Sequence, residues 1–486
     1  MLRRKRSAGR GQLSHRQINR LLPFTGAPLF HTLQLLATGD PARFHMPGHK
    51  GEPLFNTYAE VFAIDFTETR ATGDLYLGEG PIRDAEVAAA RYFGAADCFF
   101  LTGGSSQGIL AMLATAVGQG GAVLLDRECH KSVCHACALL DITPYFVSAP
   151  LIEPFAVSGE LPVDAVERQL VEHPDIRAVL VTSPTYYGVR RALPALADLC
   201  HAFGKPLLVD AAHGAHFPAV GLMTPTQQGA DMAVLSMHKT LPCLGQGAVV
   251  LAGAGVDKRA LRENTALFGT SSPSYPIMAS IDLARAYIEG PGRAAYLRAA
   301  EACGDLRAYI VRRTGFTPLT EDDFPALDPC RLTVCTAGTD TTGHRLADML
   351  WSEYGVACEM ADERNAVFIL TGADTSSSLY RLRRGLRRVS DRRHEDLPPA
   401  PTAPFPSAER VMRVREAWFA PSGRVAPAAA EGLICARPVT PYPPGVPLIW
   451  PGEKITRAHI ELICERWYNE INEITVVVSS ISKRGK

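Results

Sequence analysis

The sequence of 486 residues has no excess of charge of either sign, because 50 lysine and arginine residues balance 50 aspartate and glutamate residues. No net field therefore attracts nucleic acid or an anionic membrane, although the first residues, MLRRKRSAGRGQ, are locally basic and suggest a frayed arm. No apolar segment follows this arm as a signal peptide requires, and no hydrophobic run is long enough to cross a membrane. We expect a cytoplasmic protein.

The sequence also lacks the second ligand pair that a zinc site or a redox site would need. Cys129, Cys134 and Cys137 lie close together in ECHKSVCHACALL, but no partner pair and no thioredoxin-like context accompany them. His45 and His49 have the spacing of a helical metal pair, but the proline and glycine between them exclude a regular helix. We expect buried thiols in a reducing compartment and no bound metal.

What is present is an ordinary globular composition, 47% hydrophobic and 21% charged, which is enough for one large domain and one or two smaller ones. Between Pro81 and Gly253, short apolar runs alternate with amphipathic segments such as 107–117 and 193–204. This alternation is typical of βαβ units, so it predicts an α/β fold with a mostly parallel sheet. Gly204 is expected near the C-terminal end of the second helix.

The pattern changes after Gly255, where a loop and a long helix lead into a mixture of helices and strands. A proline-rich stretch then precedes a tail that contains TPYPPGVPLIWPGE, which has too much proline for regular structure and is expected to form a packed loop. The expected organisation is an N-terminal arm (1–55), a large domain (56–297), a small α+β domain (298–394), a linker (395–410) and a C-terminal domain (411–486).

Polar residues follow five of the expected strands. In an open parallel sheet, ligands bind beyond the carboxyl ends of the strands, so we expect these residues to converge on one crevice. They are residues 102–106, 126–131, 183–187, 210–216 and 236–239.

Four of these segments have chemistry that suits one cofactor. Asp210 ends an apolar strand, where a carboxylate is costly unless a cation such as a protonated pyridinium meets it. His130 could stack on a flat ring, and Lys239 could form an imine with an aldehyde. The turn TGGSSQG at residues 102–108 opens a helix, where free N–H groups favour a phosphate, although an ordinary serine N-cap is an alternative. Together these features predict pyridoxal 5′-phosphate.

Several segments in fixed order resemble the Orn/Lys/Arg decarboxylases, which are fold type I, aspartate-aminotransferase-like enzymes. They include RFHMPGHKG, LTGGSSQGILAML, DRECHKS, SPTYYGV, VDAAHGAHF, SMHKTLP and TPYPPGVPLIWPGE, and the resemblance extends from about Pro28 to Glu453. It implies a large domain with a mostly parallel sheet and smaller C-terminal domains. It also implies decarboxylation of a basic amino acid to an amine and CO2 that feeds polyamine synthesis, with arginine favoured over lysine or ornithine.

The resemblance also implies roles for individual residues. Lys239 would hold the cofactor covalently, Asp210 would pair with its ring nitrogen and His130 would stack on the ring, which makes these three the expected catalytic residues. Ser272 lies in a segment that a neighbouring subunit would lend to the phosphate site, so a homodimer with shared active sites is expected. The expected cofactor-binding residues are Gly104, Ser105, Ser106, His130, Thr185, Asp210, His213, Ser236, His238, Lys239 and Ser272.

The sequence departs from the commoner family pattern DEAHGAH by placing Ala211 after Asp210, which puts a polar contact near the cofactor in doubt. Only about forty residues precede FHMPGHK. The chain therefore resembles the short form of the family, without the N-terminal receiver-like domain, and no decamer built through that domain is expected.

Two questions stay open at the level of sequence. The acid that binds the distal cation of the substrate could be Glu431, Glu79 or Asp84. The main alternative function is a fold type I aminotransferase or a C–S lyase. An aminotransferase needs a late arginine for the substrate carboxylate, and Arg413, Arg415 and Arg424 are the candidates.

Overall fold

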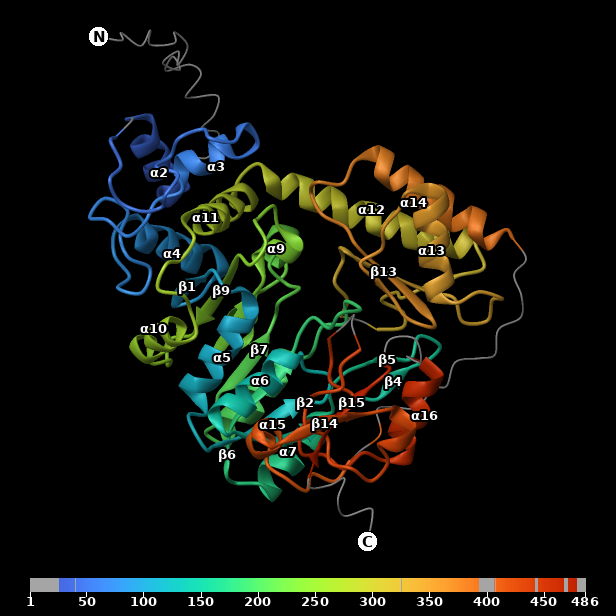
Figure 1. Ribbon diagram of the computed structural model, residues 1–486. Coiled ribbons are helices and arrows are strands. Elements are labelled where there is room, and N and C mark those ends of the chain that lie inside the picture. The colour runs from blue at the N-terminus through green and yellow to red at the C-terminus, as the bar shows by residue number, and fades with distance from the viewer. Residues whose placement is uncertain are drawn as a thin grey trace.

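A seven-stranded sheet organises the largest part of the structure (Figure 1). The computed structural model describes residues 26–39, 41–324, 326–392, 406, 408–441, 445–466 and 471–478. The strand order is β1-β9-β8-β7-β6-β2-β3, and all neighbours are parallel except the two pairs that contain β9. The strands are β1 (Asp97–Leu101), β2 (Ala122–Asp126), β3 (Thr143–Val147), β6 (Ile176–Thr182), β7 (Leu207–Asp210), β8 (Met232–Leu235) and β9 (Ala248–Ala252).

Helices bury both faces of this sheet. In β2, Leu124 packs on one face while Val123 and Leu125 pack on the other, and both sets are fully buried. Apolar runs of this kind are the signature of strands covered on two sides. One face carries α2 (Pro28–Thr38), α4 (Gly80–Phe93), α7 (Val163–Glu172), α8 (Leu193–Ala202) and α11 (Tyr275–Glu289), and the other carries α5 (Gly104–Ala116), α6 (Lys131–Leu140), α10 (Lys258–Leu267) and α15 (Val414–Phe419).

A second, four-stranded antiparallel sheet forms the core of the small domain. Its order is β10 (Thr317–Pro318), β11 (Arg331–Cys335), β13 (Asn365–Ile369) and β12 (Met360–Ala361). The helices α12 (Gly292–Arg313), α13 (Gly343–Tyr354) and α14 (Ser376–Ser390) pack on it. Helix α12 runs from the large domain to the small one (Figure 1), so the boundary expected at residues 297 and 298 falls inside a continuous helix.

The C-terminal domain has its own small core, in which β14 (Ser422–Val425) pairs antiparallel with β15 (Ile474–Val477) beside α16 (Arg457–Arg466). The described part of TPYPPGVPLIWPGE forms the expected packed loop, because Trp450 is buried and Val439 bridges Ile449. The expected linker at 395–410 lies mostly outside the described residues. The remaining elements are α3 (Ala59–Ile64), α9 (Met237–Thr240), β4 (Leu151–Ile152), β5 (Val157–Ser158) and the 3-10 turns Asn56–Tyr58, Phe217–Val220, Thr226–Gln228 and Pro427–Ala429.

Local expectations from the sequence hold in most places. Helix α5 begins three residues earlier than predicted, and Gly204 follows α8 in the left-handed region at φ +64°. The HMPGHK segment forms turns, as its proline and glycine require. The clustered thiols of Cys129, Cys134 and Cys137 are free and buried in the apolar core. Of the helices in the described ranges, none is both long enough and apolar enough to span a membrane.

Gly108 provides a test of how tightly α5 packs on the sheet. A Cβ at this position would lie 2.6–2.8 Å from side-chain atoms of Val234, Leu101 and Val250. We therefore expect Gly108→Ala to lower the free energy of unfolding by about 1–3 kcal/mol through overpacking. Denaturation with urea, followed by circular dichroism, measures the change.

The matched control is Gly304→Ala in the middle of α12. Nothing lies within 4 Å of a Cβ at this exposed position, so only helix propensity changes. The substitution should raise the free energy of unfolding by up to about 1 kcal/mol. Equal effects of the two substitutions would contradict the packing argument.

Candidate active site

A cavity of about 530 Å³ lies at the carboxyl ends of the central strands. Residues from all five of the expected polar segments line it, which confirms that these segments converge. The small domain supplies the facing wall through residues 358–365. Six of the predicted site residues line the cavity: Ser105, His130, Thr185, Asp210, His213 and Lys239.

Lys239 lies in the short helix α9, which directly follows β8. Its Nζ is 3.1 Å from Nε2 of His213. Burial lowers the pKa of the Lys239 ammonium, and the carboxylates of Asp210 and Glu359 only partly oppose this shift. A buried lysine with a lowered pKa has an available lone pair and can act as a nucleophile toward a carbonyl.

Asp210 is the last residue of β7, and its side chain is almost fully buried. Its carboxylate accepts a hydrogen bond of 3.1 Å from the N–H of Ala212. Burial raises the pKa of Asp210, while the nearby Lys239 opposes the rise. Within the part of the chain that the structure describes, no cationic side chain is in ion-pair contact with this carboxylate. A cation from a ligand would therefore be stabilised here.

His130 presents a neutral ring to the cavity. It is the N-cap of α6, where its Nδ1 accepts a hydrogen bond of 3.2 Å from the N–H of Ser132. Burial is the largest cause that lowers the pKa of His130 to about 4, and the charge of Lys239 adds to it. Since Nδ1 is an acceptor, the proton of the neutral ring is on Nε2.

The N-terminus of α5 has free backbone donors. The N-cap residue is Gly103, no side chain caps the helix, and the alternative of an ordinary serine cap at Ser105 or Ser106 is therefore wrong. Gly104 has φ +73°, a conformation that glycine adopts without strain, and its N–H donates to the carbonyl of Gln246 at 2.9 Å. Ser105 faces the cavity and Ser106 is exposed.

These residues fit pyridoxal phosphate on two further counts. The hydroxyls of Ser236, after β8, and of Thr102, after β1, are buried and have no hydrogen-bond partner among the described residues. Buried hydroxyls are normally satisfied, so oxygens of a phosphate would complete both of them. The unpaired carboxylate of Asp210 likewise suits a protonated ring nitrogen. The residues that would hold the group are those at the α5 N-terminus, Ser236, Asp210, His130 and Lys239.

The other predicted cofactor residues occupy different positions. Thr185 lines the cavity, and its hydroxyl accepts from the N–H of Val189 at 3.1 Å. His238 does not line the cavity, and its Nδ1 lies 3.0 Å from the carbonyl of Gly247. Ser272 is exposed and does not line the cavity of its own chain. Ala211 is fully buried in the apolar core and does not face the cavity.

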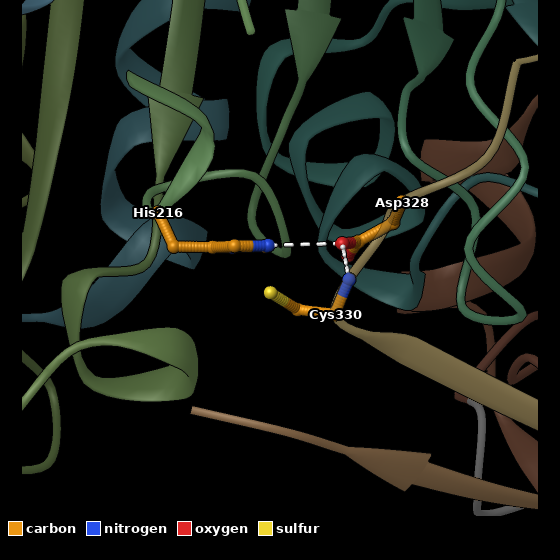
Figure 2. A group of neighbouring side chains, drawn as sticks. All are labelled: His216, Asp328 and Cys330. Carbon is orange, nitrogen blue, oxygen red and sulfur yellow. Dashed lines mark hydrogen bonds and ion pairs between the residues drawn. The ribbon is translucent and has the colours of Figure 1, made fainter. Parts of the chain in front are cut away.

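The sequence reasoning missed a buried polar cluster behind the cavity. His216 and Asp328 share a hydrogen bond of 2.9 Å between Nε2 and Oδ1, and the N–H of Cys330 donates to the same oxygen (Figure 2). Arg331 lies 3.9 Å from Oδ2 of Asp328 and contacts Nδ1 of His213 at 3.1 Å. The available signal was an arginine that opens the apolar strand RLTVC.

The carboxylates that the sequence suggested for the substrate lie outside this cavity. Glu431, Glu79 and Asp84, the candidates for the distal cation, do not line the cavity of this chain. The acids that do line it are Asp126, Glu128, Asp210, Glu359, Asp362 and Glu363.

The arginines considered for an aminotransferase are also outside the cavity. Arg413 pairs with Asp141, Arg415 donates to the carbonyl of Leu139, and Arg424 pairs with Glu473. All three contacts are on the C-terminal domain or between it and the outer surface of the large domain. The geometry therefore gives no support to an arginine of this tail as the ligand of a substrate carboxylate.

Known proteins resemble this chain in sequence and in structure. An arginine decarboxylase of Bacillus subtilis (strain 168) is 29% identical over 90% of this chain and 92% of its own, and one of Halalkalibacterium halodurans is 30% identical over 90% and 93%. The lysine decarboxylase LdcF of Francisella novicida superposes with a TM-score of 0.80 at 19% identity, over 95% of this chain and 83% of that chain.

Serine palmitoyltransferase structures, several of them with pyridoxal phosphate, match with TM-scores of 0.50–0.52, for example 0.51 at 16% identity over 63% of this chain and 75% of that chain. At this identity the match concerns the fold alone. The fold is therefore that of the fold type I enzymes. The family description "Orn/Lys/Arg decarboxylase, major domain" matches residues 27–321, and "Orn/Lys/Arg decarboxylase, C-terminal domain" matches residues 410–465. The chain belongs to the Orn/Lys/Arg decarboxylase family.

Proposed function

We propose that the protein uses pyridoxal phosphate to decarboxylate a basic amino acid, with arginine favoured, and that the product amine feeds polyamine synthesis. The observation that carries the proposal is the meeting of Lys239, Asp210 and His130 in one cavity beside unpartnered buried hydroxyls. Four relatives of 29–30% identity are named arginine decarboxylases, whereas those named lysine decarboxylases are 22–25% identical. This difference supports arginine.

When bound, pyridoxal phosphate supplies an aldehyde that bonds to amines and a ring that withdraws electrons from the bond to the departing carboxylate. Asp210 would hold the proton on the ring nitrogen, because among the described residues no cationic side chain is in ion-pair contact with its buried carboxylate. This charge interaction matters most as negative charge develops during loss of CO2. His130, neutral and fixed by its Ser132 contact, supports one face of the ring.

Lys239 has two tasks in this scheme. Its Nζ would hold the cofactor covalently, and when Nζ is free and has taken a proton from the ammonium group of the substrate, it could deliver that proton to the substrate Cα. His213 keeps Nζ in position at 3.1 Å. The walls from both domains limit the access of water, which strengthens each electrostatic interaction inside.

The distal cation of the substrate is best met by Glu359 on the small-domain wall. This residue lines the cavity, and its carboxylate accepts a hydrogen bond of 2.5 Å from the hydroxyl of Tyr186. It lies close enough to Lys239 to act on the charge of its ammonium. Glu128, on the other wall, suits a cation less well, because burial and then Asp126 raise its pKa and it already accepts from Ser158.

A homodimer with shared active sites completes the proposal. Large apolar side chains are exposed near the N-terminal end of the described chain: Phe44 at 95%, and Met46, Leu54, Phe55 and Tyr58 at more than half. A cluster of this kind is typical of an interaction surface. A second copy would cover it, and would also give the exposed Ser272 a cofactor site to contribute to.

Lys239→Ala should abolish turnover, and Asp210→Ala should slow it at least ~10²-fold, on the scale of other preorganised electrostatic groups. The measurement is release of CO2 and of the amine from arginine, lysine and ornithine by the purified protein with added pyridoxal phosphate. Near-normal turnover by either variant would overturn the role assigned to that residue. Formation of a keto acid or a thiol in place of CO2 would favour an aminotransferase or a C–S lyase.

Glu359→Gln should raise KM for the preferred substrate by about 10–100-fold and change kcat much less, since a charge-assisted hydrogen bond to the distal cation contributes about 1.5–3 kcal/mol. The matched control is Glu363→Gln, which removes a carboxylate from the same wall. The Oε1 of Glu363 lies 4.0 Å from Nε2 of His344. Steady-state kinetics with both variants decide the assignment. An equal effect of the two substitutions would show that no single carboxylate binds the cation.

A further inference from the structure

His213 lies between two basic groups that come from different domains. Its Nε2 is 3.1 Å from Nζ of Lys239, and its Nδ1 is 3.1 Å from Nη2 of Arg331. All three side chains are largely buried, and the imidazole and guanidinium are almost fully shielded from solvent. Both ring nitrogens are therefore engaged, which leaves one consistent arrangement of protons.

The guanidinium determines that arrangement because it can only donate hydrogen bonds. Nδ1 must accept from Arg331, so it carries no proton. A neutral imidazole then has its proton on Nε2, and the contact with Lys239 runs from Nε2–H to Nζ. A lysine can accept a hydrogen bond only through the lone pair of its neutral amine.

We propose that Arg331 is a positioning residue that fixes the His213 tautomer and, through the Nε2–H donor, holds the amine of Lys239 in its neutral form. Arg331 does not line the cavity, and its hydrogen bond to the site goes to His213; its charge also disfavours the ammonium form of Lys239. This inference does not rest on the proposed function, because it concerns the proton on one nitrogen before any ligand binds.

Arg331 is itself held from several sides. Its Nη1 donates to the carbonyl of Tyr186 at 3.0 Å, and Gly188 lies so close that a Cβ there would be 2.7 Å from the Arg331 side chain. Its charge faces Asp328, whose other oxygen is held by His216 and by the N–H of Cys330 (Figure 2). The His216–Asp328 pair thus provides a buried counter-charge for the guanidinium.

The charged groups around Lys239 act in both directions. Asp210, at the end of β7, and Glu359, before β12, favour the ammonium form, whereas Arg331, in β11, disfavours it. His130 and His213 are both neutral, because burial is the largest cause that lowers the pKa of each ring. The two carboxylates therefore favour the protonated form of the Lys239 amine. The Nε2–H of His213 opposes this protonation, because it donates a hydrogen bond to the lone pair of the neutral amine.

The direct test is the tautomer of His213. In the full chain freed of cofactor and labelled with 15N in its histidine rings, we expect a pyrrole-type shift for Nε2 and a pyridine-type shift for Nδ1 of His213 at neutral pH. The spectrum of His213→Phe identifies the signal by its loss. A ring with its proton on Nδ1, or a doubly protonated ring, would overturn the proposal.

The consequence is measured by competitive acetylation of the same cofactor-free chain with acetic anhydride, with the exposed Lys454 as an internal reference. His213→Phe keeps the Arg331 charge and removes the donor, so we expect the reactivity of Lys239 at pH 7 to fall about 10-fold, which corresponds to a rise of about one unit in its pKa. Arg331→Met should have a similar effect, and Arg331→Lys, which keeps a donor-only cation, should restore part of the loss.

The control is Arg307→Met. Arg307 donates to the backbone carbonyls of Asp328 and Arg331 but does not contact His213. Its removal therefore loosens the segment 328–331 without removing the hydrogen bond to His213. Its acetylation profile should match that of the wild type within about twofold. Wild-type reactivity of Lys239 in His213→Phe, or an equal loss in Arg307→Met, would show that His213 does not hold the amine neutral. No substrate or turnover enters these measurements, so their failure is distinct from failure of the proposed function.

Discussion

The site depends on the burial of both faces of the central sheet. Helices cover each face, so the strands consist of apolar residues and their polar groups are placed at the carboxyl ends. The same burial removes water from those ends. It raises the pKa of Asp210 and lowers those of Lys239 and His213 before any partner is considered. Packing that stabilises the fold therefore also prepares the chemistry.

A second requirement is the joint between the large and small domains. The loop after β6 is paired with the segment before β11, since the N–H of Asp328 donates to the carbonyl of Gly188 at 2.8 Å and Val189 bridges Leu327. Burial raises the pKa of Asp328, but His216 and Arg331 lower this pKa by more than burial raises it. The pKa of Asp328 is therefore below its usual value, and the carboxyl group is an anion. The joint is thus fixed by charge as well as by backbone contacts. It places the Arg331 guanidinium within hydrogen-bond distance of His213.

The parts of this structure that follow from local pattern could be predicted from the sequence. The alternation of apolar runs and helices indicated the sheet, and the rule that ligands bind at carboxyl ends brought Ser105, His130, Asp210 and Lys239 together correctly. Arg331 could not be found in this way. It lies 92 residues after Lys239 in another domain, and its role depends on a contact that only the docking of the two domains creates.

Glu359, the acid proposed here for the substrate cation, could not be singled out from the sequence for a related reason. The sequence offered Glu431, Glu79 and Asp84 as candidates, whereas the cavity of a single chain is completed by residues 358–365 of the small domain, which carry weak local signals. Surface carboxylates are common, and nothing in the pattern around Glu359 distinguishes it from its neighbours Asp362 and Glu363. Only the folded structure distinguishes Glu359, by placing it on the wall near Lys239.

Division of the cavity between two domains also separates reaction from substrate choice. On the proposed function, the large domain would supply the groups that act at Cα, and the small domain would supply the wall that meets the far end of the substrate. On the proposed assignment, the Tyr186 hydroxyl fixes one oxygen of Glu359, yet each carboxylate oxygen has a further lone pair. A carboxylate oriented in this way can meet a planar guanidinium with both oxygens, whereas an ammonium would use it as a point charge. The geometry of this wall is therefore a reason, independent of the relatives' names, to favour arginine over lysine.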